Sequence, residues 1–181
     1  ERNARFIEAD HSRVKAIAFD LGDNVFSCEP YGELHLPLIG RYQLKNACTA
    51  ITALEALREK GWKISDEDIR RGLSSVRWPG RFELLCSEAI FLLDGAHNPH
   101  GMAATVESLR AYFPEGNIHF LLGVMADKDV AAMTELLAPL AADFTAVRPD
   151  NDRAMSAEAL GAALAALERP GWALFIGLLA I

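Results

Sequence analysis

The sequence predicts an α/β protein whose second half forms a mostly parallel sheet with helices on both faces. From residue 82 onward, short apolar segments alternate with helical patterns, which is typical of a parallel sheet. Several of these segments end in polar loops, as strands do at the binding edge of such sheets. With 181 residues, 51% of them hydrophobic and 24% charged, the chain is long enough to bury a core in one domain or two small ones.

The net charge and the cysteine pattern limit the kinds of protein that this chain can be. A net charge of −7 argues against a general nucleic-acid binder, which needs a basic face. The three cysteines are scattered without a C-x-x-C pair, which favours a reduced, cytoplasmic setting. The chain begins without Met or a signal segment, and the apolar run at residues 172–181 is too short to span a bilayer. We therefore expect a cytoplasmic protein without a membrane partner, and a piece of a longer chain.

The first part of the chain is predicted to contain strands and then a pair of helices. The strands are expected at residues 14–19 and 34–39, and the helices at residues 44–60 and about 65–73. Pro37 makes the second strand an edge strand, because proline cannot donate to a ladder. Gly61 ends the long helix, and Ser65 caps the next one ahead of an acidic first turn. The Trp-Pro-Gly-Arg turn at residues 78–81 marks a domain boundary, with domains at 1–80 and 81–181.

The second part is predicted to alternate strands and helices. Strands are expected at residues 82–86, 89–93, 118–124, 143–147 and 172–181, and helices at about 100–113, 130–140 and 156–167. Ser156 is the expected cap of the last helix. Polar loops follow three of the strands, at residues 94–100, 125–129 and 148–153. Since parallel strands end at one edge of the sheet, we expect these loops to form a binding cleft.

The first of these loops carries the densest set of polar side chains. Asp94 directly follows a buried strand, so its carboxylate suits the hydroxyl groups of a ribose. A cap of the next helix is the alternative role for Asp94. Asp94, His97 and His100 also have the spacing of a metal triad, but Pro99 interrupts the helix that such a triad needs. We favour His97 as a donor to a phosphate or carboxylate near a helix N-terminus.

Three further residues are candidates for ligand contacts. Lys128 is either a solvated surface lysine or a point charge for an anionic substrate. Asn46 has an amide that can bind an adenine edge, or it caps the long helix. Arg81 lies at the boundary turn and is either a surface residue or a ligand contact between domains.

Some common motifs are missing from the sequence. It has no G-x-x-x-x-G-K-[ST] phosphate loop and no G-x-G-x-x-G turn. No serine, histidine and aspartate are arranged as a nucleophile elbow. Residues 19–23 (FDLGD) resemble the aspartate signature of haloacid-dehalogenase-type phosphatases, but the second aspartate is one residue too far along.

Five short segments follow one another in a recognisable order. They are residues 36–47 (LPLIGRYQLKNA), 78–81 (WPGR), 93–99 (LDGAHNP), 123–129 (GVMADKD) and 153–154 (RA). Together they resemble the folylpolyglutamate synthase/dihydrofolate synthase family of the Mur ligase superfamily, over about residues 34–154. The resemblance implies that residues 1–80 are the last part of a central α/β ATPase domain. It also implies that residues 81–181 form most of a Rossmann-like glutamate ligase domain, truncated at its end.

The resemblance also implies site roles. Asn46 would contact the adenine of ATP, Arg81 the nucleotide from the hinge, and Asp94 the ribose. His97 would be the catalytic residue near the phosphates or the incoming glutamate. The residues expected on the glutamate side are Lys128, Arg153 and Asn98.

The implied reaction is the ATP-dependent addition of L-glutamate to dihydropteroate or folate polyglutamates through an acyl phosphate. Its cofactors are ATP and Mg²⁺, and the resemblance places the phosphate loop and the Mg²⁺ ligands upstream of Glu1. We therefore expect the isolated chain neither to bind Mg-ATP tightly nor to turn over. The partners are small molecules only, with no nucleic acid or membrane, and the protein is expected to be a monomer.

Two alternatives to the folate ligase remain open. The first is another Mur-type ligase that adds amino acids to a peptidoglycan precursor, although Gln43 and the Asp-Gly-Ala-His sequence favour the folate branch. The second is an inactive remnant that keeps only part of a nucleotide site. A response-regulator-like domain is disfavoured, because Asp94 lacks an acidic cluster around it.

Overall fold

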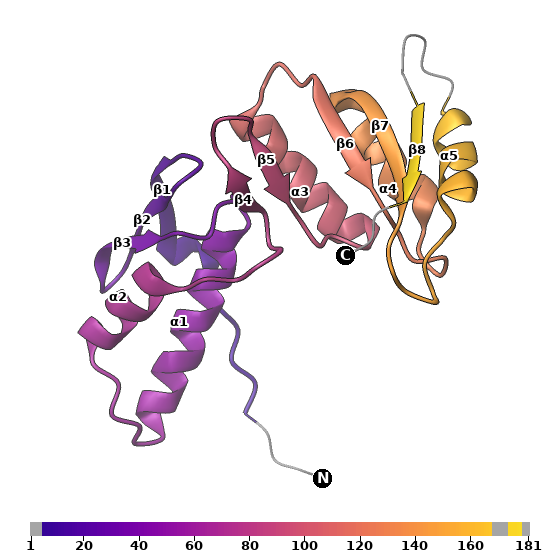
Figure 1. The fold of residues 1–181 in the computed structure, drawn as a ribbon. Helices are drawn as coiled ribbons and strands as arrows, with labels where there is room; N and C mark the ends of the chain where they lie inside the picture. The colour runs from indigo at the N-terminus through magenta and orange to yellow at the C-terminus, as the bar shows by residue number, and fades with distance from the viewer. Residues whose placement is uncertain (1–4, 168–173, 179–181) are drawn as a thin grey trace. The chain divides into compact units, whose positions relative to one another are not determined.

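Two units make up the chain, Glu1–Gly95 and Ala96–Ile181. The structure is a computed structural model that describes residues 5–167 and 174–178. It confirms the predicted α/β class with a parallel sheet and helices. Figure 1 shows the first unit in indigo to magenta and the second in salmon to yellow.

The first unit is built on an antiparallel sheet of three strands. They are β1 (Val14–Phe19), β2 (Asn24–Cys28) and β3 (Gly32–Leu36), in the order β1-β2-β3. The strand expected at residues 34–39 does lie at the edge as β3, but it begins and ends earlier. β2 was missed because Asn24 and Ser27 weaken its apolar pattern. Asp20 holds the β1–β2 turn by accepting the N–H groups of Gly22 and Asp23 at 2.7 and 2.9 Å, which is a structural role.

Two helices follow, α1 (Gln43–Glu59) and α2 (Asp66–Ser75), close to their predicted positions. Ser65 caps α2 as expected. Its hydroxyl accepts the N–H of Asp68 at 3.1 Å, and the Asp68 carboxylate accepts the N–H of Ser65 at 2.9 Å. Such a capping box stabilises a helix start by about 1 kcal/mol.

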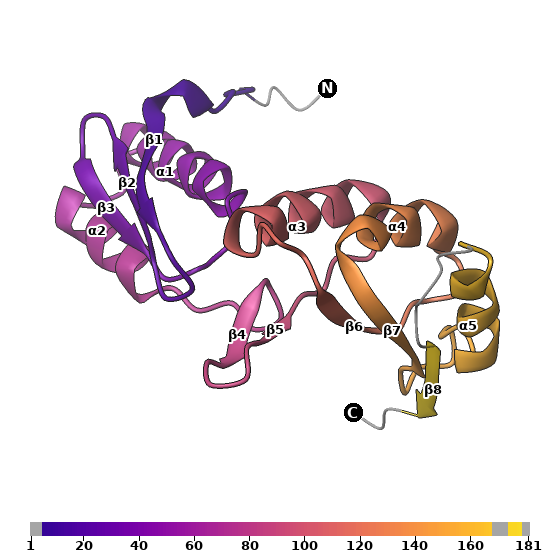
Figure 2. The ribbon, with the colours of Figure 1, turned by 90° about the horizontal axis from the view of Figure 1, so that it is seen from above.

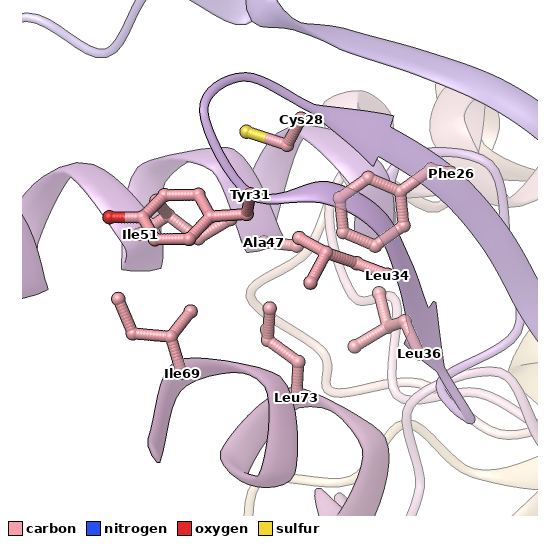
Figure 3. Packing of buried hydrophobic residues seen from close by; sticks show 9 residues of the cluster. All are labelled: Phe26, Cys28, Tyr31, Leu34, Leu36, Ala47, Ile51, Ile69 and Leu73. Carbon is pink, nitrogen blue, oxygen red and sulfur yellow. The ribbon is translucent and has the colours of Figure 1, made fainter. Parts of the chain in front are cut away.

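One face of the three-stranded sheet packs on both helices. Alternate residues of β2 and β3 point to this face because side chains alternate along a strand. Residues four apart on α1 and α2 meet them. The buried cluster shown in Figure 3 consists of Phe26, Cys28, Tyr31, Leu34, Leu36, Ala47, Ile51, Ile69 and Leu73. This cluster anchors the N-terminal end of α1, where one of the predicted site residues lies.

A charged pair ties α1 to Arg13, the residue that directly precedes β1. The guanidinium of Arg13 donates to both carboxylate oxygens of Glu55 at 2.6 and 2.8 Å, and the Tyr31 hydroxyl donates to Glu55 at 3.0 Å. The hydrogen bond from Arg13 outweighs partial burial and lowers the pKa of Glu55. The two side chains are only 23% and 29% exposed, so solvent screens this pair less than a surface pair.

We expect the pair of Arg13 and Glu55 to make the free energy of unfolding fall as the pH becomes acidic. Because the pKa of Glu55 is lowered in the folded state, its contribution is complete above its ordinary value near 4.5 and is lost as pH falls through the lowered value. Glu55→Gln should therefore unfold at lower urea near pH 7, and it should lose less stability between pH 5 and pH 3. Urea unfolding across this range measures both effects. Glu59→Gln is the matched control, since Glu59 pairs with Arg5 on the exposed surface. A parallel pH response of Glu55→Gln and the unsubstituted protein would contradict the assignment.

The strands expected at residues 82–86 and 89–93 are present as β4 (Glu83–Cys86) and β5 (Phe91–Leu93). They pair antiparallel with one another in a separate sheet, not in the parallel sheet. The expectation that the loop at residues 94–100 leaves the same sheet edge as the other two loops is therefore wrong. Only residues 87–90 connect the strands, and such a short link permits a hairpin but not a parallel crossover.

The second unit contains a parallel sheet with strand order β6-β7-β8. Its elements are α3 (Pro99–Tyr112), β6 (Ile118–Leu122), α4 (Val130–Leu137), β7 (Ala141–Arg148), α5 (Ala157–Ala165) and β8 (Leu174–Leu178). Figure 2 shows α3 beside α4, and α5 next to β7 and β8. The rest of the strand predicted at 172–181 lies outside the described residues. No helix in the described ranges is both long and apolar enough to cross a membrane.

Candidate functional site

The boundary turn and the end of β5 form one hydrogen-bonded substructure in the first unit, which we call the hinge clasp (residues 80–83 and 93–95). The N–H of Gly95 donates to the carbonyl oxygen of Gly80 at 2.8 Å. Glu83 and Leu93 are partners in the β4–β5 register. The Glu83 carboxylate in turn accepts the N–H of Gly80 at 2.7 Å. The hinge clasp therefore fixes the backbone positions of Arg81, which follows Gly80, and of Asp94, which precedes Gly95.

Asp94 is half-buried in the hinge clasp. Its Oδ2 accepts the N–H of Phe82 at 2.8 Å and lies 3.5 Å from the hydroxyl of Tyr42, at the outer limit of a hydrogen bond. The alternative role of Asp94 as the cap of the next helix is wrong, because that cap is Asn98. Asp94 is thus a carboxylate held by backbone, with the acceptor chemistry that a ribose requires.

Arg81 lies next to an aromatic ring. Its guanidinium carbon is 5.4 Å from the ring centroid of Trp78, which is a favourable cation–π distance. The Arg81 residue is half-buried, whereas Trp78 is 53% exposed. Arg81 therefore has a preferred position over the indole and is not a freely solvated surface arginine.

Asn46 lies in the first turn of α1 and does not cap it. The cap position is Tyr42, which makes no capping side-chain bond, so the capping alternative for Asn46 is wrong. Asn46 Nδ2 donates to Oε1 of the buried Gln43 at 2.8 Å, and the Asn46 side chain remains exposed. The Asn46 N–H bonds the Tyr42 carbonyl at 3.3 Å, and the Tyr42 hydroxyl approaches Asp94. Tyr42 thus links two predicted nucleotide residues, and sequence reasoning did not single it out.

His97 and Asn98 belong to the second unit, at the start of α3. Asn98 Oδ1 accepts the N–H of Gly101 at 2.8 Å and is the N-cap of the helix. Pro99 occupies the first helical position, where its missing N–H is not needed, so it begins the helix and does not interrupt it. His97 is exposed immediately before the cap. The sequence-based roles of both residues stay predictions.

The loops that follow β6 and β7 are joined in the second unit as expected for neighbouring parallel strands. Met125 and Ala154 form an isolated antiparallel bridge. Around it, the Ala126 N–H donates to the Arg153 carbonyl at 2.8 Å, and the Met155 N–H donates to the Val124 carbonyl at 2.9 Å. We call this substructure the loop clasp (residues 124–129 and 149–155).

The loop clasp brings two predicted cations to one carboxylate. Asp127 Oδ2 lies 2.8 Å from Nη2 of Arg153 and 3.3 Å from Nζ of Lys128. Lys128 is 28% exposed, so it is not a fully solvated lysine. Desolvation by neighbouring atoms raises the pKa of Asp127, but the hydrogen bond from Lys128 and the positive charge of Arg153 together lower it by more, so the pKa lies below its usual value. Lys128 and Arg153 thus share one carboxylate in a loop clasp that also carries Asp129, Asp150 and Asp152.

Gly123 makes the loop clasp possible, and sequence reasoning gave it no role. A Cβ at this position would lie 2.8 Å from Cγ and 2.9 Å from Cδ of Pro149. Such distances are shorter than atoms tolerate, so only glycine permits this approach. The available signal was a glycine near the end of the strand predicted at residues 118–124 and a proline two residues after the strand predicted at residues 143–147.

In the described part of the chain, no group of three histidine, cysteine, aspartate or glutamate side chains could hold a metal ion. The spacing of Asp94, His97 and His100 therefore does not produce a metal site among these residues. The location of the Mg²⁺ ligands outside this chain stays a prediction.

Comparison with known proteins identifies similar enzymes. The folylpolyglutamate synthase of Lacticaseibacillus casei is 37% identical over 106 residues, which cover 58% of this chain and 24% of that protein. The dihydrofolate synthase/folylpolyglutamate synthase of Mycobacterium tuberculosis is 34% identical over 143 residues, which cover 78% of this chain and 29% of that protein. The chain thus spans less than a third of the length of these relatives.

Solved structures agree with the sequence comparison. The structure of Mycobacterium tuberculosis folylpolyglutamate synthase complexed with ADP is similar with a TM-score of 0.80 and 27% identity, over 92% of this chain and 38% of that chain. E. coli FolC in complex with DHPP and ADP is similar with a TM-score of 0.67 and 28% identity, over 91% of this chain and 37% of that chain.

The family model described as "Mur ligase, glutamate ligase domain" matches residues 80–174, which is more than half of the chain. The match begins at the Pro-Gly turn that the sequence suggested as a boundary. It includes β4, β5 and the loop clasp. The resemblance inferred from the five motifs is confirmed by these comparisons. The chain therefore belongs to the Mur ligase family and corresponds to the C-terminal portion of folylpolyglutamate synthase/dihydrofolate synthase enzymes.

Proposed function

We propose that the complete protein containing this chain is an ATP-dependent ligase that adds L-glutamate to dihydropteroate, to folate polyglutamates, or to both. The observation that carries this proposal is the backbone-held carboxylate of Asp94 inside the family motif at residues 93–99. The similar enzymes from Lacticaseibacillus casei and Mycobacterium tuberculosis are named for this activity.

The hinge clasp is proposed to bind the nucleotide. Asp94 accepts hydrogen bonds from the ribose hydroxyls, and the exposed amide of Asn46 contacts the adenine edge. Arg81 adds a positive charge from its position over Trp78. Similar structures were solved with ADP, and another, 24% identical, with AMPPNP and a Mn ion, which supports ATP with a divalent cation. We propose Mg²⁺ as that cation, held by residues outside this chain, where it neutralises phosphate charge.

The second unit is proposed to hold the incoming glutamate. Lys128 and Arg153 are the two cationic side chains of the loop clasp, and each can pair with a glutamate carboxylate. We also assign Asn98 to the binding of glutamate, although its Oδ1 already caps α3. His97 is the proposed catalytic residue, since an imidazole at a helix start can donate to a phosphate or carboxylate.

The proposed reaction proceeds in two steps. An oxygen of the folate or pteroate carboxylate attacks the γ-phosphorus of ATP, and ADP leaves, which forms an acyl phosphate. The glutamate amine then attacks the acyl carbon, inorganic phosphate leaves, and the amine proton is lost as the amide forms. Cations stabilise the charge that moves with the phosphoryl group. The residues named above orient the two substrates, which lowers the entropic barrier to their encounter.

We further propose a cytoplasmic monomer whose partners are small molecules and not nucleic acid or membrane. The formal charge of −7 supports the exclusion of a general nucleic-acid partner.

A coupled assay of ADP release by the complete protein tests the proposed function. Release should require L-glutamate together with dihydropteroate or tetrahydrofolate. Release that depends on a peptidoglycan precursor would favour another Mur-type ligase. The absence of release with any acceptor would favour an inactive nucleotide-binding remnant and would contradict the proposal.

A further inference from the structure

The turn of the hinge clasp has an unusual backbone. Gly80 and Phe82 both have positive φ angles, 70° and 51°, and Arg81 lies between them. Glycine adopts this conformation freely, but a bulky side chain resists it by about 1–2 kcal/mol. Phe82 is nevertheless only 1% exposed, so its ring is held in the interior. In this conformation the Phe82 N–H points at Asp94. Such an uncommon backbone persists only where neighbouring contacts hold it.

The contacts that hold the turn converge on Gly80. Its N–H donates to Oε2 of Glu83 at 2.7 Å, and its carbonyl oxygen accepts the N–H of Gly95 at 2.8 Å. A Cβ on Gly95 would lie 3.2 Å from that oxygen, which shows how closely the two segments approach. Glu83 is the only one of these three residues that acts through its side chain. Its carboxylate provides a charge-assisted bond, which is stronger than a bond between neutral groups.

We propose that Glu83 is a positioning residue for the nucleotide site. By closing the turn at Gly80, its carboxylate keeps Arg81 and Asp94 in one register, so that both are in place before the nucleotide arrives. This inference rests on the proposed function, because it takes Asp94 and Arg81 as nucleotide contacts. Glu83 touches neither substrate nor cofactor in this scheme.

Preorganisation of this kind acts on binding more than on chemistry. Without the carboxylate, Gly80 and Phe82 leave their left-handed conformations and the Phe82 N–H turns away from Asp94. The nucleotide must then order the turn as it binds, which weakens its apparent affinity. We expect Glu83→Ala to raise the KM for ATP about threefold to tenfold, the range that a single lost hydrogen bond produces. The value of kcat should stay within about twofold, since the reacting groups are unchanged.

A pair of variants separates positioning from simple stability. Glu83→Gln keeps an oxygen that accepts the Gly80 N–H, so it should restore the KM for ATP to within about twofold of the unsubstituted protein. Glu88→Ala is the matched control, because Glu88 is exposed in the same hairpin and should change nothing. The kinetic constants are measured on the complete protein, with the melting temperature of each variant as a check on folding.

Amide hydrogen exchange on the 181-residue chain provides a second measurement that needs no nucleotide. Glu83→Ala should speed exchange at the N–H groups of Gly80 and Gly95 about threefold or more, and leave the β6–β7 ladder unchanged. An unchanged KM for ATP in Glu83→Ala, when Asp94→Ala raises it, would overturn the positioning role alone. If Asp94→Ala also has no effect, the proposed nucleotide site fails. Exchange then still decides whether Glu83 holds the turn, and unaltered exchange at Gly80 and Gly95 would overturn that as well.

Discussion

Asp94→Ala in the complete protein is expected to raise the KM for ATP at least about tenfold, with a smaller change in kcat. A hydrogen bond to a charged group contributes about 1.5–3 kcal/mol, and each 1.4 kcal/mol is a tenfold change in affinity. A ribose donates two such bonds to the carboxylate in the proposed complex. Steady-state kinetics with ATP varied at saturating glutamate and folate measures the effect.

Asp94→Asn serves as the control for the hinge clasp. Its amide oxygen can still accept the Phe82 N–H, so the backbone around residues 80–83 is retained while the charge is lost. We expect a KM for ATP between those of the unsubstituted protein and Asp94→Ala. A KM for ATP that does not respond to either substitution would rule out the ribose role of Asp94.

Gly123→Ala is expected to destabilise the second unit by about 1–3 kcal/mol, the usual range for a side chain forced into a packed site. The added methyl group overlaps the ring of Pro149, so the loops after β6 and β7 must move apart. This movement loosens the bridge between Met125 and Ala154. Urea unfolding measures the loss of stability. In the complete protein, a raised KM for glutamate should accompany it, because Lys128 and Arg153 lose their common partner Asp127.

Gly72→Ala is the matched control for this substitution. Gly72 lies within α2, and a Cβ there meets nothing within 4 Å. Alanine is favoured over glycine inside a helix by about 0.5–1 kcal/mol, so this variant should be slightly more stable. Equal stabilities of Gly123→Ala and Gly72→Ala would show that the close approach to Pro149 does not constrain the loop clasp.

Local patterns in the sequence predicted most of the helices and strands. The three- and four-residue spacing that predicted α1 and α3 comes from the helix period, and Ser65 and Ser156 cap the helices as expected. β2 was the exception, because its buried face alternates with residues of weak strand preference. These signals need only a few neighbouring residues, so tertiary structure changed them little.

Strand pairing was less predictable. The strands ending at residues 86 and 93 were expected in the parallel sheet, but they form a hairpin of their own. The length of the connection already excluded parallel pairing of these two strands, since residues 87–90 are too few for a crossover. By contrast, β6 and β7 are separated by a helix and pair in parallel as expected. The carboxyl-terminal edge of the parallel sheet therefore contains the loops after β6 and β7, and the third predicted loop is divided between the two units.

The sequence by itself determined the class of the fold, the order of most elements and, through its motifs, the family. Only the tertiary structure decided which neighbours hold the site residues. It placed the cap of α3 on Asn98 and not on Asp94, and it gave Asp94 the Phe82 N–H as a partner. It also joined Lys128 to Arg153 through Asp127. Helix periods and caps depend on residues within one or two turns, whereas these partners come from segments far apart in the chain. Their meeting depends on strand register and on close approaches such as that at Gly123, which no local pattern encodes.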